Sequence, residues 1–412
     1  MHYLEQLQLV NYKNHDFLTL EFSAKVNAIV GRNGVGKTNV LDAVHYLSMC
    51  KSYLNPLDKQ NIRLSQPYFS IQGLWKTEEQ QDLIVCSVKS GSKKVVKRNK
   101  VVYEKLSDHI GLFPVVFISP YDGDLIAEGN EFRRKWLDGI IAQIDRKYLD
   151  DLMSFHRILE QRNALLKRIS SGISHRDELA IWNPSFEEIG ERIFQRRAAF
   201  IEEFIPLFRA NFQQIGNEEE EPGILYRSDF HKGEFTQLLS QNERRDLMFQ
   251  YSTIGPQKDE INFTLNQQPV KKFGSQGQQK SFILALRLAQ YHYLHFHAGK
   301  KPVLLLDDIF DKLDSTRVQR QRGRRVIGAA HHLLHALPVA DLEGRRRQLV
   351  DGDPRAEDAR QVAVFGHREI VVVRRIDRLD LGRGSQRPGR GGNSANEASK
   401  DGTAIDGRAH HG

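Results

Sequence analysis

The sequence predicts an α/β fold interrupted by an inserted helical lobe, and three observations predict it. An apolar run at 26–30 ends at a glycine-rich loop that opens a helical pattern, which gives the order strand, loop, helix. A second apolar run, at 303–306, ends in two aspartates. Between these runs, residues 131–216 carry apolar side chains every three or four positions, as a helix does.

Length and composition narrow the class of protein. The 412 residues predict two or three domains, and 40% hydrophobic with 27% charged residues is typical of a globular protein. No apolar run is long enough for a membrane span, and no secretory signal opens the chain. Two cysteines, Cys50 and Cys86, cannot build a disulfide framework or a zinc cage. These features favour a cytoplasmic protein without a membrane partner.

The first part of the chain reads as strands around one helix. Alternating residues at 3–10 and 17–30 predict strands, the second ending in a buried strand at 26–30. After Gly36 one helical face carries Val40, Ala43, Val44 and Leu47. Short strands are expected over 68–103, with a hairpin turn at 97–100. The apolar residues 115–118 predict another buried strand, closed by Ser119 and Pro120.

The middle of the chain predicts two long helices. Leu152, Phe155, Leu159, Leu166 and Ile169 share a face that Arg162 breaks. Ser185 and Glu188 after Pro184 form a capping box, so the next helix should run from there to Ile215 over roughly 45 Å. The pair would form an antiparallel hairpin too short for a coiled-coil arm, followed by a loop at 217–223.

These patterns suggest four regions. They are a first α/β lobe over 1–140, a helical lobe over 141–250, a return to the first lobe over 251–317 and a tail over 318–412.

The glycine-rich loop fits the pattern of a phosphate-binding loop. Its residues are Gly31, Arg32, Asn33, Gly34, Val35, Gly36, Lys37 and Thr38. Glycines let backbone N–H groups surround a phosphate, and the following helix directs its positive end toward the same place. The Lys37 ammonium suits the β- and γ-phosphates of ATP, and the Thr38 hydroxyl suits Mg²⁺. A strand before the loop and a helix after it make an accidental match improbable.

The acidic strand end supplies the partner of that loop. An aspartate that follows a buried strand beside a phosphate loop can hold the Mg²⁺ of the nucleotide. We therefore expect Asp307 to bind the metal and Asp308 to act as the general base. Taken alone, such an Asp-Asp pair is an ordinary strand-to-turn pattern, and only its pairing with the phosphate loop favours this function.

A third segment lies between these motifs, where Ser275, Gln276, Gly277 and Gln278 begin an apolar helix. An ordinary helix cap explains it in isolation. Its position resembles the signature motif of ABC-type ATPases, in which the signature of one subunit closes on the γ-phosphate held by the other. The sequence thus indicates a P-loop NTPase of the ABC/SMC type, an ATPase head.

Five stretches together resemble the RecF family of bacterial DNA repair and replication proteins. They are Leu9–Tyr12 with Asn14-His15; Gly31–Ala43; Phe117–Leu125 leading to Arg133–Asp138; Gly255–Glu260; and Gly274–Lys280 with Leu304–Asp308 and the Asp311–Asp314 turn that resembles a D-loop. The resemblance covers residues 1–317.

The resemblance implies a function for the chain. It implies an ATP-dependent homodimer that binds single-stranded, gapped or junction DNA and releases it after a weak, DNA-stimulated hydrolysis. It further implies recombinational repair, replication-fork maintenance, support of the SOS response, and RecO and RecR as partners.

The chain departs from the family in two places. Gly255–Glu260 reads Gly-Pro-Gln-Lys-Asp-Glu where the family usually has Gly-Pro-His-Arg-Asp-Asp, a change that keeps a cation and acids. After Arg317 nothing resembles the helix, strand and switch that the family continues with, so a core strand is lost. We expect this to impair folding or activity.

The composition changes at the same point. Residues 318–412 hold 17 Arg, one Lys, 12 acids and one aromatic residue, Phe365, and they carry +6 of the net charge of +8. A natural basic tail that binds phosphates is one interpretation. A slipped reading frame near residue 317 is the interpretation we favour, and the segment carries no function here.

The DNA-binding role is implied by the resemblance more than by any residue pattern, and basic clusters are its candidate surfaces. The candidates are Lys93, Lys94, Lys97 and Arg98 near the predicted hairpin, with Lys89 and Lys100, and Arg133 with Arg134 at a helix start. Solvated charge on an exposed face explains the first cluster equally well. Any contact would be mainly to phosphates.

Two other functions compete. A P-loop enzyme or kinase acting on a small molecule is disfavoured by the Ser275–Lys280 element and by the lack of an obvious lid or acceptor site. A purely structural SMC-like scaffold is disfavoured because no long heptad arm is present.

Overall fold

The computed structural model describes residues 2–77, 80–215 and 219–307. The predicted base Asp308, the Asp311–Asp314 turn and the 318–412 segment therefore lie outside the described residues.

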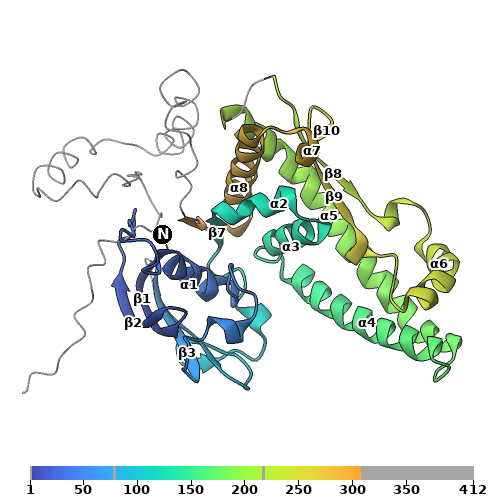
Figure 1. The fold of residues 1–412 in the computed structure, drawn as a ribbon, viewed down its shortest axis with the longest axis horizontal. Coiled ribbons are helices and arrows are strands. Elements are labelled where there is room, and N and C mark those ends of the chain that lie inside the picture. Colours follow the sequence, from blue (N-terminus) through green and yellow to red (C-terminus); the bar gives the residue numbers. More distant parts are fainter. Residues whose placement is uncertain (1, 78–79, 216–218, 308–412) are drawn as a thin grey trace, which may run out of the picture. The chain divides into compact units, whose positions relative to one another are not determined.

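The N-terminal part, drawn in blue to cyan in Figure 1, forms a six-stranded antiparallel sheet in the order β2-β1-β3-β4-β5-β6. In β4 buried and more exposed side chains alternate along the strand, so one face of the sheet is apolar. The predicted strands over 68–103 and the turn before β6 are confirmed, because Asn99 and Lys100 both have the positive φ of a tight hairpin turn. The strands are β1 (Tyr3–Tyr12), β2 (His15–Glu21), β3 (Tyr68–Lys76), β4 (Gln81–Lys89), β5 (Val95–Arg98) and β6 (Val101–Val102).

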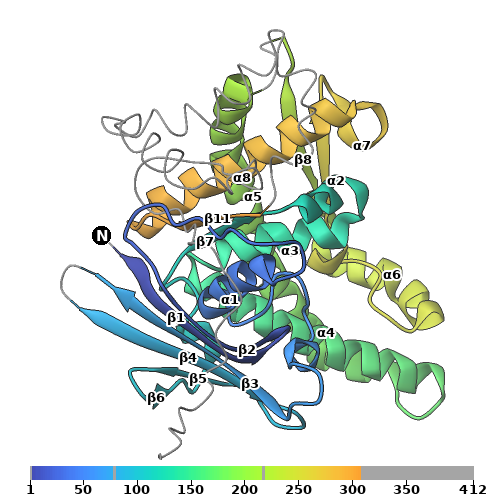
Figure 2. The same ribbon diagram turned by 60° about the vertical axis from the view of Figure 1, so that its left-hand side comes forward.

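Helix α1 (Lys37–Met49) packs on the apolar face of this sheet (Figure 2). The predicted helical face is confirmed, since Val40, Ala43, Val44 and Leu47 are all buried. Leu47 approaches the sheet so closely that a Cβ on Gly73 of β3 would lie 2.4 Å from its Cδ1. Glycine at that position allows the helix to sit against the strand.

A separate two-stranded parallel sheet joins β7 (Val115–Ile118) to β11 (Val303–Leu306). Both strands were predicted, and β7 is buried throughout, as its four consecutive apolar residues require. The Asp307 N–H continues the pairing by donating to the Ile118 carbonyl at 2.9 Å. The chain ends that follow these strands therefore lie at the same edge.

The predicted buried strand at 26–30 is corrected. No strand is assigned there, and Val26, Ala28, Ile29 and Val30 are only half-buried. A strand exists through its ladder of hydrogen bonds, and no described segment forms a ladder with these residues. Apolar composition alone could not reveal that the partner is missing from residues 2–77, 80–215 and 219–307.

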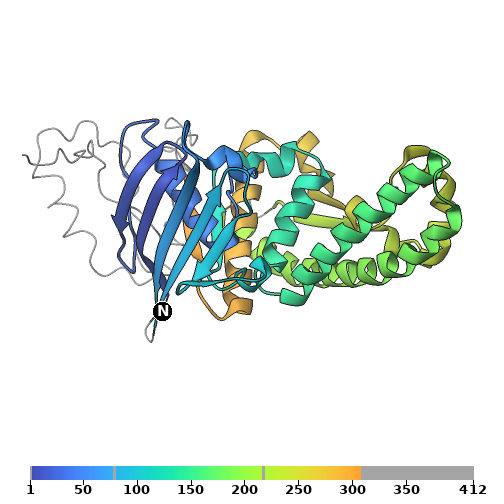
Figure 3. The same cartoon turned by 90° about the horizontal axis from the view of Figure 1, so that it is seen from below.

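The helical lobe lies between β7 and β11 in sequence. The predicted hairpin of long helices is confirmed, with α4 and α5 packed along each other (Figure 3). A three-stranded sheet in the order β10-β9-β8 packs against α5 and α3. The helices are α2 (Asp124–Ala127), α3 (Asn130–Ile141), α4 (Arg146–Ser170), α5 (Leu179–Ile215), α6 (Phe235–Phe249), α7 (Val270–Phe273) and α8 (Gln276–Ala298); the strands are β8 (Pro222–Arg227), β9 (Glu260–Leu265) and β10 (Gln268–Pro269).

Short 3₁₀ turns occur within the described ranges. They are η1 (Asp58–Asn61), η2 (Leu106–Asp108), η3 (Pro120–Gly123), η4 (Arg176–Glu178), η5 (Asp229–His231) and η6 (Pro256–Lys258).

The predicted start of α5 at Ser185 is wrong, because the helix begins at Leu179 and contains Pro184. The capping box lies earlier, where the His175 N–H donates to the Glu178 carboxylate. The helix continues through Pro184 and, later, through Pro206, although each proline removes one N–H from the helical hydrogen bonds. The predicted loop at 217–223 also ends early, since Pro222 is the first residue of the edge strand β8, a position that suits proline.

The core of the lobe is an aromatic ladder on α5. Phe200, Phe204, Phe208 and Phe212 recur every fourth residue and are fully buried. Tyr293 of α8 meets Phe200 edge-on at a ring distance of 4.9 Å, and Phe282 meets Phe208 at 4.8 Å. Residues four apart share one helix face, so this spacing presents a continuous aromatic surface to α8.

Arg162, the predicted break in the apolar face of α4, is buried with an exposed side-chain fraction of 1%. Its guanidinium donates to Asp246 at 2.8 Å, to Ser252 at 2.7 Å and to Asn183 at 3.0 Å. The Phe186 ring lies 5.2 Å from the guanidinium carbon. One arginine therefore ties α4 to α5, α6 and the segment after α6.

Replacing this arginine should destabilise the protein strongly. Arg162→Ala leaves the buried Asp246 carboxylate without its charge partner, which costs about 3–5 kcal/mol in the free energy of unfolding. Chemical denaturation measures the loss. Arg157→Ala is the matched control, because Arg157 is exposed on the same helix and its removal should change stability by less than about 0.5 kcal/mol. Equal effects of the two substitutions would contradict a structural role for Arg162.

Candidate functional site

The glycine-rich loop 31–36 leads directly into α1. Gly34 and Gly36 have φ of +82° and +100°, a left-handed backbone that favours glycine. The Lys37 ammonium donates to the carbonyls of Gly31 at 2.8 Å and Arg32 at 3.2 Å, so the side chain folds back across the loop. The structure thus brings together the predicted phosphate-loop residues at the N-terminus of a long helix, where free N–H groups and the helix dipole favour an anion.

The turn between β1 and β2 packs on this loop. The Asn14 side chain donates to the Gly34 carbonyl at 3.3 Å and accepts from the Asn39 amide at 2.7 Å. A ring nitrogen of His15 lies 3.1 Å from the Gly36 carbonyl. Sequence reasoning noted Asn14 and His15 only as part of a resemblance and missed this contact, which links residues about twenty positions apart.

Asp42, one turn into α1, organises the surroundings of the loop. Its carboxylate is fully buried and pairs with the Lys13 ammonium at 2.6 Å. It also accepts hydrogen bonds from the Tyr12 hydroxyl at 2.5 Å and the Ser52 hydroxyl at 2.7 Å. Burial opposes ionisation of Asp42, but the Lys13 charge and these donors hold its pKa below the ordinary value.

Thr38 and Asp307 meet across most of the chain. The Thr38 hydroxyl donates to an Asp307 carboxylate oxygen at 2.9 Å, and Asp307 is buried. A hydroxyl and a carboxylate are oxygen ligands of the kind that Mg²⁺ prefers, with phosphate and water completing its shell. The donor set therefore fits Mg²⁺, although no group of three or more His, Cys, Asp or Glu that could hold a metal occurs among the described residues.

Ser275 begins α8 as its N-cap. Its hydroxyl accepts from the Gln278 N–H at 3.2 Å, and its own N–H donates to the Gln278 side chain at 2.7 Å, which forms a capping box. Ser275, Gln276 and Gly277 are exposed, and Gln278 also donates to Glu220 at 2.8 Å.

The two ends of α8 serve different parts of the molecule. Figure 2 shows the helix running from α7 to the neighbourhood of β11. Its 23 residues span about 34 Å, and Ser275 caps the end that follows α7. The structure does not bring the predicted signature residues to the phosphate loop of the same chain.

A second buried cluster connects α8 to the helix of the phosphate loop. The Arg287 guanidinium donates to Asp122 of η3 at 2.6 Å and to the Tyr53 hydroxyl at 2.8 Å. The Tyr53 N–H in turn donates to Asp42 at 2.7 Å. Sequence reasoning missed this chain of contacts, because no local pattern marks a residue whose partners lie 165 and 234 positions away.

The predicted DNA contact at Arg133 is corrected. The guanidinium is buried and donates to the carbonyls of Leu125 at 2.8 Å, Ile126 at 3.1 Å and Ile261 at 2.9 Å. Its donors are occupied by backbone, so it is not available to a phosphate. Arg134 is half-buried and donates to the Asp259 carbonyl at 2.6 Å. A basic pair at a helix start could not distinguish such internal pairing from an exposed patch.

The hairpin cluster divides into paired and exposed cations. Lys94 pairs with Asp58 at 2.8 Å, and Arg98 donates to both oxygens of Asp82 at 2.8 and 2.9 Å. Both cations are therefore paired with carboxylates of this chain. The others are exposed or half-buried: Lys89, Lys93, Lys97 and Lys100.

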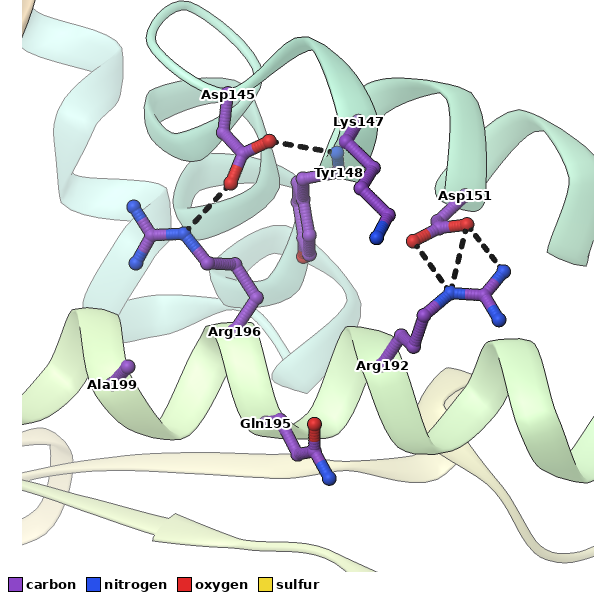
Figure 4. Close-up of a pocket in the computed structure, with 8 residues that line it drawn as sticks. All are labelled: Asp145, Lys147, Tyr148, Asp151, Arg192, Gln195, Arg196 and Ala199. Atoms are coloured by element: carbon purple, nitrogen blue, oxygen red, sulfur yellow. Dashed lines mark hydrogen bonds and ion pairs between the residues drawn. The ribbon is translucent and has the colours of Figure 1, made fainter.

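A polar cleft of about 320 Å³ lies between α4 and α5. Figure 4 shows Asp145 beside Arg196 and Asp151 beside Arg192 across it. The ion-pair distances are 3.0 and 2.7 Å. Because the two arginines are paired with carboxylates of the facing helix, we assign them to holding α4 against α5.

Comparison with known proteins gives the same picture over most of the chain. The family model described as the RecF/RecN/SMC N-terminal domain matches residues 3–324. A protein of Flavobacterium johnsoniae named DNA replication and repair protein RecF is 46% identical over 321 residues, covering 77% of this chain and 89% of that protein. One of the same name from Bacteroides fragilis is 44% identical over 318 residues, covering 77% and 85%.

Solved structures agree with these relatives. One described as the recombination mediator protein RecF with ATP in the RecFOR pathway has a TM-score of 0.73 and 30% identity. The match covers 79% of this chain and 89% of that one. The likeness bears out the predicted ABC/SMC-type ATPase head. None of the helices in the described ranges could cross a membrane.

Filling the space at Gly36 should weaken nucleotide binding. A Cβ there would lie 2.5 Å from side-chain atoms of Asn14 and His15, so Gly36→Ala must push these side chains away from the loop, and it adds strain at a φ of +100°. We expect ATP affinity to fall at least about tenfold, measured by calorimetry, since one tenfold step corresponds to about 1.4 kcal/mol of distortion.

The matched control is Gly91→Ala. Gly91 has a similar φ of +76° with no atom within 4 Å of its Cβ position, so only backbone strain is added. Unchanged affinity in Gly36→Ala would show that the turn does not shape the phosphate loop.

Proposed function

The chain belongs to the RecF family of DNA replication and repair proteins, and from that premise we propose that it is an ATP-gated DNA-binding protein. The single observation that carries the proposal is the 2.9 Å hydrogen bond between Thr38 and Asp307. It joins the phosphate loop to the acidic strand end, the two parts a nucleotide and its metal need in one place. The role in DNA metabolism is proposed from the relatives named DNA replication and repair protein RecF, of whose length this chain covers 85–89%.

Each residue of the loop has a role in this proposal. The backbone N–H groups of 31–38 and the Lys37 ammonium hold the β- and γ-phosphates of ATP. Thr38 and Asp307 hold Mg²⁺, which lowers the charge of the phosphates when bound. Asp308, the next residue after Asp307, accepts a proton from the water that attacks the γ-phosphate. Burial of Asp307 against α1 keeps its carboxylate beside the loop.

Dimerisation completes the site. Ser275, Gln276 and Gly277 are exposed at the N-terminus of α8, with Gln278 half-buried beside them. A second copy could place this end over the γ-phosphate, where its N–H groups and the Ser275 hydroxyl would bind the anion. ATP then holds two subunits together, and hydrolysis removes the group that joins them.

The proposed partner, whose binding ATP controls, is DNA. We propose that the dimer binds single-stranded or gapped DNA, acts in recombinational repair and replication-fork maintenance, and supports the SOS response. A solved relative is described as part of the RecFOR pathway, which supports RecO and RecR as partners here too. Lys89, Lys93, Lys97 and Lys100 stay candidates for phosphate contacts, and such contacts would weaken steeply with salt.

Removing the Lys37 charge should abolish ATP binding. In Lys37→Ala the loop loses the ammonium that now lies 2.8 Å from the Gly31 carbonyl, and we expect affinity to fall by about a hundredfold or more, or about 3 kcal/mol. Fluorescence of a labelled ATP analogue measures it. The control is Lys25→Ala, an exposed lysine close in sequence. Undiminished nucleotide affinity in Lys37→Ala would refute the assignment of the loop.

A matched pair at Ser275 tests dimerisation separately from ATP binding. Asn and Asp both cap helices as well as serine does, so Ser275→Asn and Ser275→Asp should fold alike. Only the aspartate brings a negative charge against a γ-phosphate, and we expect it to abolish the ATP-dependent increase in mass while ATP still binds. Light scattering with and without ATP and Mg²⁺ measures this. Normal dimerisation of Ser275→Asp would exclude a contact in trans.

A further inference from the structure

Two segments at one end of the helical lobe concentrate positive charge, and the single acid within them is buried. Residues 161–176 contain four Lys or Arg and no acid, and residues 244–258 contain three Lys or Arg and one acid, Asp246. Asp246 is buried against Arg162, so it does not offset the surface charge. The exposed cations are Lys167, Arg168, Arg176, Arg244, Arg245 and Lys258. We call this the lobe-end surface. Its bounding carboxylates in sequence are Glu160, Asp177, Glu243 and Asp259.

The two segments form one surface because they contact each other. The Ser170 hydroxyl at the end of α4 donates to the Leu247 carbonyl at the end of α6 at 2.7 Å. The Ser252 N–H donates to the Asn163 side chain at 2.7 Å. Asp246 accepts from Thr253, which holds the segment after α6 back against the helix. The backbone that carries the surface is therefore anchored by buried hydrogen bonds.

Aromatic rings lie among these cations. Phe249 is 45% exposed and Tyr251 is 41% exposed, and their ring centres are 5.8 Å apart. The Arg245 guanidinium lies 5.9 Å from the Phe249 ring, and the Lys258 ammonium lies 4.7 Å from the Tyr251 ring. Rigid exposed rings beside cations are the elements with which proteins bind single-stranded nucleic acid, because bases stack on the rings while phosphates meet the cations.

We propose that the lobe-end surface binds single-stranded nucleic acid, with Phe249 and Tyr251 stacking on bases and the surrounding cations binding phosphates. The proposal rests on the proposed function for its partner, DNA, and places a contact far from the phosphate loop in sequence. An acidic peptide would also suit the cations, but it would not need flat rings paired with them. Base stacking is sequence-tolerant, so this surface should bind without base readout.

Two sets of variants separate stacking from charge. The first is Phe249→Ala with Tyr251→Ala, and the second is Arg244→Gln with Arg245→Gln. The probe is a labelled single-stranded oligothymidylate bound to the full chain in the presence of ATP, measured by fluorescence anisotropy over a series of salt concentrations. The ring variant should lose about tenfold or more in affinity while the salt dependence stays the same. The charge variant should lower the slope of log K against log salt by about 1.4, because each phosphate contact on a single strand contributes about 0.7.

The control variants carry the same chemistry elsewhere. Phe296→Ala removes an aromatic ring that is 81% exposed at the end of α8, and Lys89→Gln with Lys93→Gln removes two exposed cations near the hairpin. Phe296→Ala should leave binding unchanged. Combining Lys89→Gln and Lys93→Gln with the ring variant should not alter the fold-loss in affinity that the ring variant causes. Thermal unfolding and ATP affinity of all variants should match the unaltered chain.

Each failure has its own meaning. If the unaltered chain does not bind the oligothymidylate, the proposed function fails and this site with it. If the unaltered chain binds and the ring and charge variants bind equally well, only the lobe-end surface is wrong. If the variants keep DNA affinity but lose affinity for an acidic peptide probe, the surface is a protein-docking site and the proposal is overturned.

Discussion

The parallel pairing of β7 with β11 is the constraint on which the rest of the structure depends. Parallel strands cannot be joined by a tight turn, so the chain must travel far before it returns. Here the path from Ile118 to Val303 builds the whole helical lobe, with its aromatic core on α5 and α8. Because the strands end at the same edge, Asp307 comes to lie beside Thr38. A slip of one residue in this pairing would move the carboxylate away from α1.

Buried charges then fix the parts that surround this edge. Asp42 holds Lys13 and the segment after α1, and Arg287 holds Asp122 and Tyr53. A buried charge destabilises the folded state unless it is paired. These pairs therefore favour one arrangement of the elements that carry them over other arrangements. Through Tyr53 the two clusters form a continuous path from the phosphate-loop helix to α8, whose other end carries Ser275. Within one chain, the path links the phosphate loop of one proposed ATP site to the helix whose Ser275 end would serve the other site of the dimer.

The sequence predicted the features that depend on local chemistry. Apolar period and helix signals located α1, β7, α4 and α8, and glycine spacing located the phosphate loop, because these patterns act over a few residues. What failed depends on distant partners. Arg133 and Arg162 are cations whose pairing with carbonyls and with Asp246 appears only in three dimensions. The lobe-end surface was missed although its signal, the absence of acids over 161–176, stands in the sequence.

The segment 26–30 also depends on a partner that is distant in sequence. It leads directly into the phosphate loop, yet no described segment pairs with it, and the Asn27 side chain makes local bonds to the backbone of Ser23 and Lys25. The family resemblance implies a further core strand after the Asp311–Asp314 turn, and the chain ceases to resemble the family after Arg317. A partly buried backbone whose N–H and C=O groups lack partners is unfavourable, so the geometry of the loop depends on whether a strand is supplied there. Nucleotide affinity therefore reports on the 318–412 segment as well as on Lys37, and an affinity equal to that of intact relatives would show that the loop needs no such strand.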